Sequence, residues 1–149
     1  MLLKEICTPE VIQCPPETSV LAAARLMRER HVGDLVVIDP GEDGQTPIGV
    51  VTDRDIVIEV LAAELDPAKV TVRAIMRTPV VVAHGSEDLA QAIERMSAHG
   101  VRRIPVMDEE ERLLGIITLD DLLKQLASAA TAIVDIISRE RNHEQRTRR

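Results

Sequence analysis

The chain of 149 residues contains no phenylalanine, tyrosine or tryptophan. Its core must therefore be filled by Val, Ile, Leu, Met and Ala, and a planar ligand has to lie between aliphatic side chains. Single-stranded nucleic acids usually stack their bases on aromatic rings. The formal net charge of −7 is also unfavourable for contacts with nucleic-acid phosphates. We therefore expect no nucleic-acid partner.

Cysteines and long apolar runs are scarce too. Cys7 and Cys14 fit neither a CxxC pair nor a four-ligand zinc set. We expect buried free thiols, with a disulfide as the alternative. No apolar run approaches the roughly 18 residues of a membrane span. The segment Met1 to Glu5 carries charges where a signal peptide needs an unbroken apolar stretch. We expect a cytoplasmic protein with no membrane partner.

Patterns typical of catalysis and metal binding are also missing. The four histidines do not form a ligand set. No Ser/His/Asp or Cys/His arrangement with a supporting motif occurs, and no glycine-rich phosphate loop. The sequence thus predicts a protein that is not an enzyme, with no catalytic residues and no metal site, and with no required cofactor.

The chain does contain an internal repeat. A shift of 69 residues places Val11 on Val80 and Met27 on Met96. After a loop that is three residues longer in the first copy, a shift of 66 places Gly49 on Gly115. Each copy has the pattern β-α-β-β-α, in which short apolar runs alternate with helical periodicity. The predicted fold class is α/β (α+β), with two such repeats related by a pseudo-twofold axis.

The elements expected in the two copies match each other. The first helix of each copy has Thr18 or Ser86 as its expected N-cap and apolar residues at the i, i+3, i+4, i+7 spacing. In the first copy we expect strands at 11–12, 35–38 and 48–51 and a second helix at 54–63. In the second copy we expect strands at 80–82, 104–107 and 113–117 and a second helix at 120–126. One copy has too little apolar surface to fold alone, so both form one unit. We divide the chain into repeat 1 (1–66), repeat 2 (67–127) and a C-terminal helix with a basic tail (128–149), and 64–70 is the linker.

The apolar pattern continues beyond Leu126, at Ala130, Ile133, Val134 and Ile137. This predicts one more amphipathic helix, whose apolar face extends past what either repeat needs and suits a homodimer contact. From 139 to 149 the chain carries five arginines and two glutamates, a local charge of +3 that leaves −10 elsewhere. Such an end is usually solvated and only occasionally a docking site.

The segments Gly49 to Ile56 and Gly115 to Leu122 are the most informative for function. In each, a glycine and an apolar strand lead to a threonine that opens a helix, with an aspartate three residues later. Thr52 and Thr118 can donate to a phosphate at the helix start, and Asp55 and Asp121 can accept from a ribose diol. The alternative is a capping box. Repetition in register with the glycine, which allows close approach of a ligand or of another backbone, favours a ligand.

Two arginines precede the strand at 104–107. Arg102 and Arg103 point to opposite faces of an extended chain, and a guanidinium group suits phosphate. The alternative is a solvated strand end with surface ion pairs. In the first copy the same places hold Gly33 and Asp34. Because an aspartate repels phosphate, we expect the two sites to differ.

This tandem set of motifs resembles a pair of cystathionine-β-synthase (CBS) domains, over about Ile6 to Ala127, and in particular the stand-alone bacterial members. The resemblance implies two clefts that bind AMP, ADP, ATP or sometimes S-adenosylmethionine, and dimers in which two pairs form a disc. It implies that Thr52 and Asp55 belong to one cleft and Thr118 and Asp121 to the other. It further implies that phosphates contact Arg102 and Arg103, and that adenine contacts Val11, Val80, Ile104 and Pro105.

The sequence therefore predicts a regulatory module that senses adenine nucleotides. Ligand binding would change the shape of a homodimer and bias an unknown regulated protein. Two alternatives stay open: a structural or protein-interaction module with no nucleotide ligand, and an S-adenosylmethionine binder.

Overall fold

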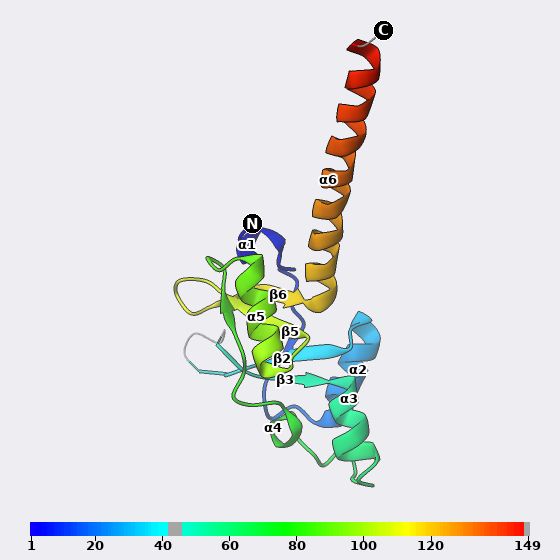
Figure 1. Cartoon of the computed structure of the whole chain (residues 1–149). Coiled ribbons are helices and arrows are strands. Elements are labelled where there is room, and N and C mark those ends of the chain that lie inside the picture. Colours follow the sequence, from blue (N-terminus) through cyan, green and yellow to red (C-terminus); the bar gives the residue numbers. More distant parts are fainter. Residues whose placement is uncertain (42–45, 148–149) are drawn as a thin grey trace.

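The computed structural model describes residues 1–41 and 46–147, so the loop that is longer in the first copy lies partly outside the described residues. The elements follow one another along the chain in the same order in both repeats (Figure 1). Repeat 1 comprises α1 (Leu3–Ile6), β1 (Gln13–Cys14), α2 (Val20–Arg30), β2 (Asp34–Ile38), β3 (Pro47–Thr52), α3 (Asp53–Ile56) and the π-helical turn η1 (Val57–Leu61). Repeat 2 comprises α4 (Val72–Ile75), β4 (Ala83–His84), α5 (Leu89–His99), β5 (Arg103–Met107), β6 (Leu113–Thr118) and α6 (Leu119–Thr147).

Two three-stranded sheets with the same topology confirm the predicted duplication. In each sheet the first strand is parallel to the middle strand, which pairs antiparallel with the third. The registers agree as well: Val37 pairs with Gly49 in one sheet, and Val106 pairs with Gly115 in the other. The predicted α/β fold with two related repeats is therefore correct, and each repeat also has a short helix, α1 or α4, in front of the predicted pattern.

The predicted N-caps of the first helices are wrong by one or two residues. Ser19, not Thr18, caps α2 by accepting a hydrogen bond from the Ala22 amide at 3.1 Å. In repeat 2 the cap is Asp88, not Ser86, and it forms a reciprocal capping box with Gln91. A side chain two positions earlier lies too far from the orphan amides of the first turn to satisfy them.

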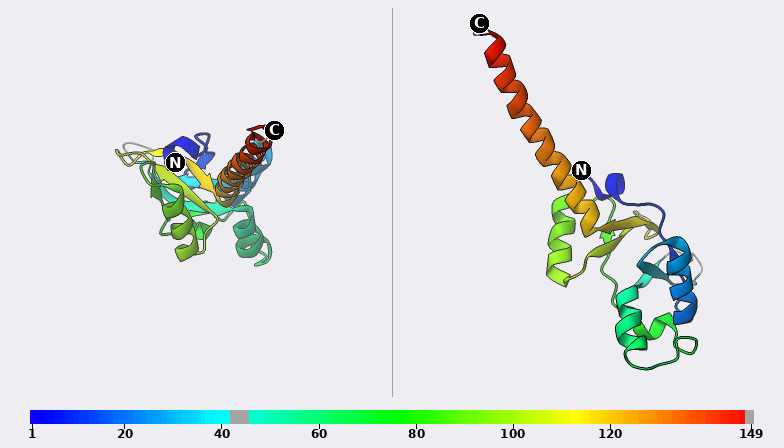
Figure 2. Two further views of the ribbon diagram at one scale, coloured as in Figure 1. Left: turned by 45° about the horizontal axis from the view of Figure 1, so that its top comes forward. Right: turned by 90° about the vertical axis from the view of Figure 1, so that its right-hand side faces the viewer.

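The C-terminal helix is not a separate element. The predicted helix at 120–126 and the further helix beyond it form the single helix α6, from Leu119 to Thr147, which projects far from the two repeats (Figures 1 and 2). The sequence 119–147 contains no glycine or proline, so no residue that strongly favours a helix end interrupts it. None of the helices in the described residues combines the length and hydropathy needed to cross a membrane.

The core of each repeat is completed by the short helix at the start of the other repeat. Leu3 of α1 is fully buried among Ala92, Ile104 and Ile117 of repeat 2. Val72 of α4 is fully buried in the core of repeat 1. Matched backbone bridges hold the exchanged segments, because Thr8 pairs with Ile116 as Arg77 pairs with Val50. The two copies therefore cannot be separated without opening both cores.

The motif glycines serve this exchange. A Cβ on Gly49 would lie 2.7 Å from the Met76 sulfur, and one on Gly115 would lie 2.7 Å from both the Cys7 sulfur and the Thr8 carbonyl oxygen. Of the two roles predicted for these glycines, close approach of another part of the chain is the one that the structure displays. Here the approaching segments are the residues that follow α1 and α4.

Both cysteines are free thiols, as predicted: Cys14 is buried and Cys7 is half-buried. Burial raises the pKa of both thiols above the ordinary value, although a backbone hydrogen bond at Cys7 and the Thr18 side chain at Cys14 oppose the shift. The two thiols are therefore less nucleophilic than an exposed cysteine at the same pH.

Candidate functional site

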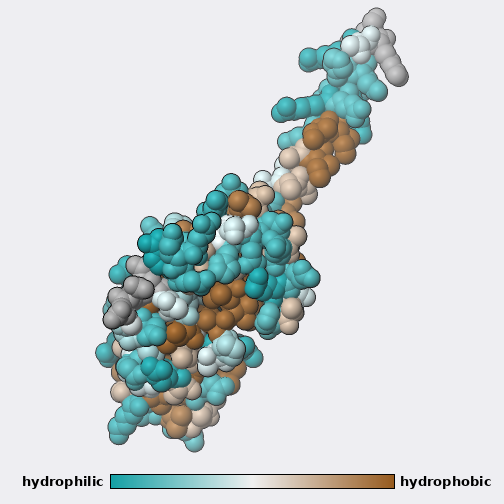
Figure 3. Space-filling view, turned by 90° about the vertical axis from the view of Figure 1, so that its left-hand side faces the viewer, coloured by the Kyte–Doolittle hydropathy of each residue, from teal (hydrophilic) through white to brown (hydrophobic). Residues whose placement is uncertain are grey.

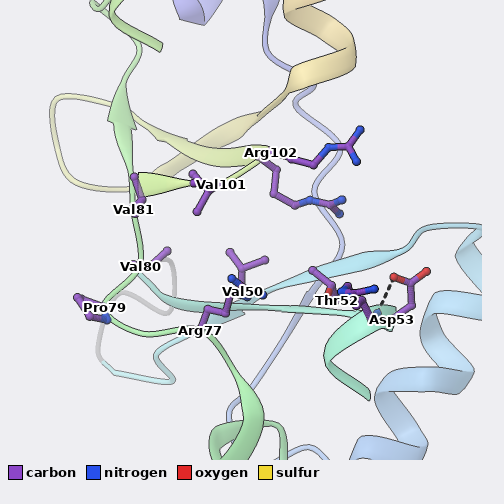
Figure 4. A pocket seen from close by; sticks show the side chains of 12 residues that line it. Val50, Thr52, Asp53, Arg77, Pro79, Val80, Val81, Val101 and Arg102 are labelled. Carbon is purple, nitrogen blue, oxygen red and sulfur yellow. Dashed lines mark hydrogen bonds between the residues drawn. The ribbon is translucent and has the colours of Figure 1, made fainter. Parts of the chain in front are cut away.

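A cavity of about 340 Å³ lies between the two repeats, where the end of β3 faces the segments before β4 and β5 (Figure 4). A volume of this size is in the range of small-molecule sites. Its lining comes from one segment of repeat 1 and two segments of repeat 2. The segment of repeat 1 is Val50, Thr52, Asp53 and Arg54, and those of repeat 2 are Arg77, Pro79, Val80 and Val81, and Gly100, Val101, Arg102 and Arg103.

One end of the cavity is aliphatic. Val50 approaches from one side, and Val80, Val81 and Val101 come from the other repeat (Figure 4). With no aromatic residue in the chain, these branched side chains are the surface that a flat apolar ring can contact. The end is therefore a slot suited to a planar heterocycle.

The other end is polar and positively charged. Thr52, Asp53 and Arg102 lie toward this end (Figure 4), and Arg54, Arg77 and Arg103 also line the cavity. The lining contains four arginines and one aspartate, and two of these arginines, Arg77 and Arg103, also contact carboxylates outside the lining. The net positive charge attracts anions, and guanidinium groups bind phosphate through paired hydrogen bonds. The cavity thus combines an apolar slot with an anion-binding wall.

Arg103 already has a partner across the pseudo-twofold axis. Its guanidinium forms an ion pair with Asp34, the residue that occupies its own position in the first repeat. Burial raises the pKa of the Asp34 carboxyl group above its ordinary value, Arg103 opposes that shift through its charge and hydrogen bond, and the Asp53 carboxylate adds to it. The two positions that the sequence marks as different therefore contact each other.

Both Thr-x-x-Asp segments form the capping boxes that we considered as the alternative to a ligand role. The Thr52 amide donates to Asp55 Oδ2 at 2.9 Å, and the Asp55 amide donates to Thr52 Oγ1 at 3.1 Å. Asp55 is only 7% exposed, and its Oδ1 lies 3.4 Å from Nε of Arg77. Thr118 and Asp121 repeat the same pair of bonds. The cap and a ligand contact remain compatible, because each carboxylate keeps its second oxygen outside the box.

The remaining predicted site residues do not all line the cavity. Val80 lines the cavity, while Ile104 is fully buried in the core of repeat 2 and Pro105 is buried beside it. Neither of these two is among the residues that line the cavity. Val11 packs against the cluster between the sheets that contains Ile116. Sequence reasoning missed Arg77, because the shift that aligns the repeats places it on the uncharged Thr8.

The residues that align with the lining of this cavity in the other half of the repeat carry the opposite charge. Under the two shifts, Arg54 falls on Asp120, Pro79 on Glu10 and Arg103 on Asp34. The other two arginines fall on uncharged residues. The set of matching positions thus contains three acids and neither lysine nor arginine, so it lacks the guanidinium groups that line the first cleft.

Among residues 1–41 and 46–147, no group of three or more His, Cys, Asp or Glu side chains is placed to hold a metal ion.

This fold and its cleft are those of a tandem CBS domain pair, and the chain belongs to that family. The CBS domain model matches it twice, over residues 3–62 and 72–128. Hypoxic response protein 1 of Mycobacterium tuberculosis is 38% identical over 120 residues, which cover 80% of this chain and 81% of that protein. An uncharacterized protein of Methanopyrus kandleri, MK0525, is 32% identical over 120 residues, and the chain spans 60% of its length.

Solved structures agree with this assignment. A crystal structure of Hypoxic Response Protein I with two coordinated zinc ions superposes with a TM-score of 0.73 at 32% identity, covering 83% of this chain and 98% of the other. The CBS domain pair of protein MJ0100, solved with 5′-methylthioadenosine and S-adenosyl-L-methionine, gives a TM-score of 0.75 at 27% identity, covering 87% and 98%. A CBS pair of similar fold thus binds adenosyl compounds.

Proposed function

We propose that this protein is a regulatory module that binds an adenine nucleotide in the cleft lined by Thr52, Val80 and Arg102. The observation that carries the proposal is the polarity of that cleft, with valines at one end and arginines at the other. An adenine nucleotide has the same polarity, with a flat ring at one end and phosphate at the other. The proposed role is binding rather than catalysis.

In this proposal each part of the ligand has a contact in the cleft. Adenine lies between Val50, Val80 and Val101, which removes its faces from water. The phosphates accept hydrogen bonds from Arg102, from Arg103 and from the Thr52 hydroxyl. Asp55 fixes Thr52 through its capping oxygen, and we propose that the ribose hydroxyls share its second oxygen, Oδ1, with Nε of Arg77.

For the second cleft, with Thr118 and Asp121, we propose no tight binding of AMP, ADP or ATP. Its charged positions Glu10, Asp34 and Asp120 repel phosphate. This charge favours a ligand without phosphate, and it supports S-adenosylmethionine, which carries a positive sulfonium group, as the second candidate. The MJ0100 domain pair binds that compound.

A thermal-shift panel tests the proposal, because a ligand that binds only the folded state raises its apparent stability. The panel comprises AMP, ADP, ATP, adenosine, S-adenosylmethionine and a control without ligand. We expect the phosphorylated compounds to raise the melting temperature more than adenosine does. If none of the compounds raises it, the protein is a structural or interaction module instead.

We also propose that the module works as a homodimer, in which a change of shape on ligand binding is passed to a regulated protein. Apolar residues at matched positions of the two repeats are exposed: the exposed fraction is 51% for Val57 in η1 and 55% for Leu123 in α6. Figure 3 places further apolar side chains midway along the projecting helix, with polar side chains beyond them. On α6 the apolar residues at 119, 123, 126, 130, 133 and 137 alternate at spacings of four and three residues.

Such a spacing is typical of helices that pair side by side. A second copy is the partner that this helix fits, because it supplies the same stripe and the same length. Sedimentation velocity should show a dimer that Ile133→Glu weakens and that Ser138→Glu, a charge control off the stripe on the same helix, leaves intact. A monomer at all accessible concentrations would rule the homodimer out.

A further inference from the structure

The ion pair between Arg103 and Asp34 joins the two clefts. Arg103 lines the nucleotide cleft, while Asp34 stands at the matching position of the other cleft. Residues related by a twofold axis and close to that axis contact each other, so a charge substitution at one of them changes the environment of both. Here one copy carries the arginine that suits phosphate, and the other carries an acid of opposite charge.

The pair is partly shielded from water. The side chain of Arg103 is 30% exposed and that of Asp34 is 20% exposed. At such exposure an ion pair is screened less than it is on an open surface. A phosphate that enters the cleft must therefore take Arg103 from an existing anionic partner.

The separation of Arg103 from Asp34 has a second cost. A Cβ built on Gly33, next to Asp34, would lie 3.1 Å from a carboxylate oxygen of Asp53, so the Asp53 carboxylate lies close to this segment. Without Arg103, two carboxylates would face each other with less compensation. Arg102 differs, because it makes none of the ion pairs found within the described residues. It is therefore available to an incoming phosphate at once.

We infer that Asp34 is an internal competitor for the ligand phosphate, which holds Arg103 in the empty cleft and limits nucleotide affinity. This inference rests on the proposed nucleotide function and specifies how its affinity is set. When phosphate binds, Arg103 exchanges one anion for another, and the Asp34 carboxylate is released toward the second cleft.

Isothermal titration calorimetry with AMP and with adenosine on the full chain tests the inference. Asp34→Asn removes the competing charge and keeps the shape of the side chain. We expect it to tighten AMP binding roughly threefold to tenfold, as for the loss of a partly buried ion pair, and to leave adenosine binding unchanged. Asp135→Asn on the exposed face of α6 makes the same change in net charge far from the cleft and should have no effect.

The double variant Asp34→Asn with Arg103→Ala decides the mechanism, because the gain from Asp34→Asn should vanish when Arg103 is absent. A gain that persists without Arg103, or one that Asp135→Asn reproduces, overturns the inference. So does an AMP affinity unchanged by Asp34→Asn in a protein that binds AMP, and the proposed nucleotide function then still stands. If neither wild type nor Asp34→Asn binds AMP, the proposed function fails first. Asp34→Ala repeats the test if the asparagine variant does not fold.

Discussion

Truncation of Leu3 to alanine should destabilise the whole protein, although the residue is close to the chain start. Terminal residues usually tolerate change unless they are tied into the fold. Leu3 is fully buried in the core of repeat 2, between Ala92 and Ile104. Buried Leu→Ala changes cost about 2–5 kcal/mol, because they remove apolar contacts and leave a cavity. For a chain of this size, each kcal/mol lowers the melting temperature by about 2–4 °C.

Urea denaturation of Leu3→Ala, with Leu65→Ala in the linker as the matched control, measures this cost. Leu65 is 50% exposed, so its truncation should change the free energy of unfolding by less than about 0.5 kcal/mol. The urea midpoint of Leu3→Ala should fall while the slope of the transition stays the same, which indicates lower stability without a change in the surface exposed. If both variants unfold at the wild-type midpoint, α1 does not belong to the core of repeat 2 and the exchange of segments is wrong.

Three further predictions concern the motif residues. Asp121→Ala should lose about 0.5–2 kcal/mol of stability, as expected for a lost cap, and keep its thermal response to AMP; a lost response would mean that Asp121 binds the nucleotide. Gly115→Ala should cost about 1–3 kcal/mol by overpacking, whereas Gly41→Ala, where a Cβ would lie 3.8 Å from its nearest neighbour, should be tolerated in the same urea assay. The raised pKa of Asp34 means that the folded protein holds this proton more tightly than the unfolded chain. The resulting stability is present below the unfolded pKa of about 3.9 and is lost as the pH rises through the higher folded value. Asp34→Asn, which does not titrate, should therefore gain stability relative to wild type as the pH is raised from about 4. If urea titrations show that the free energy of unfolding of the variant falls relative to that of the wild type as the pH increases, this reasoning is wrong.

Local pattern was enough to predict much of this fold. The apolar runs that end in Thr52 and Thr118 are the third strands of the two sheets, and both threonines stand at equivalent strand-to-helix junctions. Helical periodicity correctly predicted that Val20 and Met27 are buried. These features depend on neighbours a few residues away, so a repeated sequence specifies them twice.

Features that depend on distant contacts were not predictable in the same way. The exchange of α1 and α4 between the cores involves segments that lie far apart in the sequence, and no periodicity marks it. The pairing of Arg103 with Asp34 needs both positions to lie at the pseudo-twofold axis, whereas the alignment shows only that they are equivalent. The alignment, which matches Arg77 with Thr8, likewise shows nothing of the backbone bridge to Val50 that brings Arg77 to the cleft.

Calorimetric titration of the wild-type protein and Arg102→Ala with AMP is the most direct test of nucleotide binding in a single cleft. We predict one AMP per chain for the wild type. Arg102→Ala should bind AMP more weakly and adenosine nearly as well, because it removes charge-assisted bonds to phosphate and leaves the apolar slot intact. Two equal tight AMP sites per chain, or no heat of binding with AMP, ADP or ATP, would contradict the account.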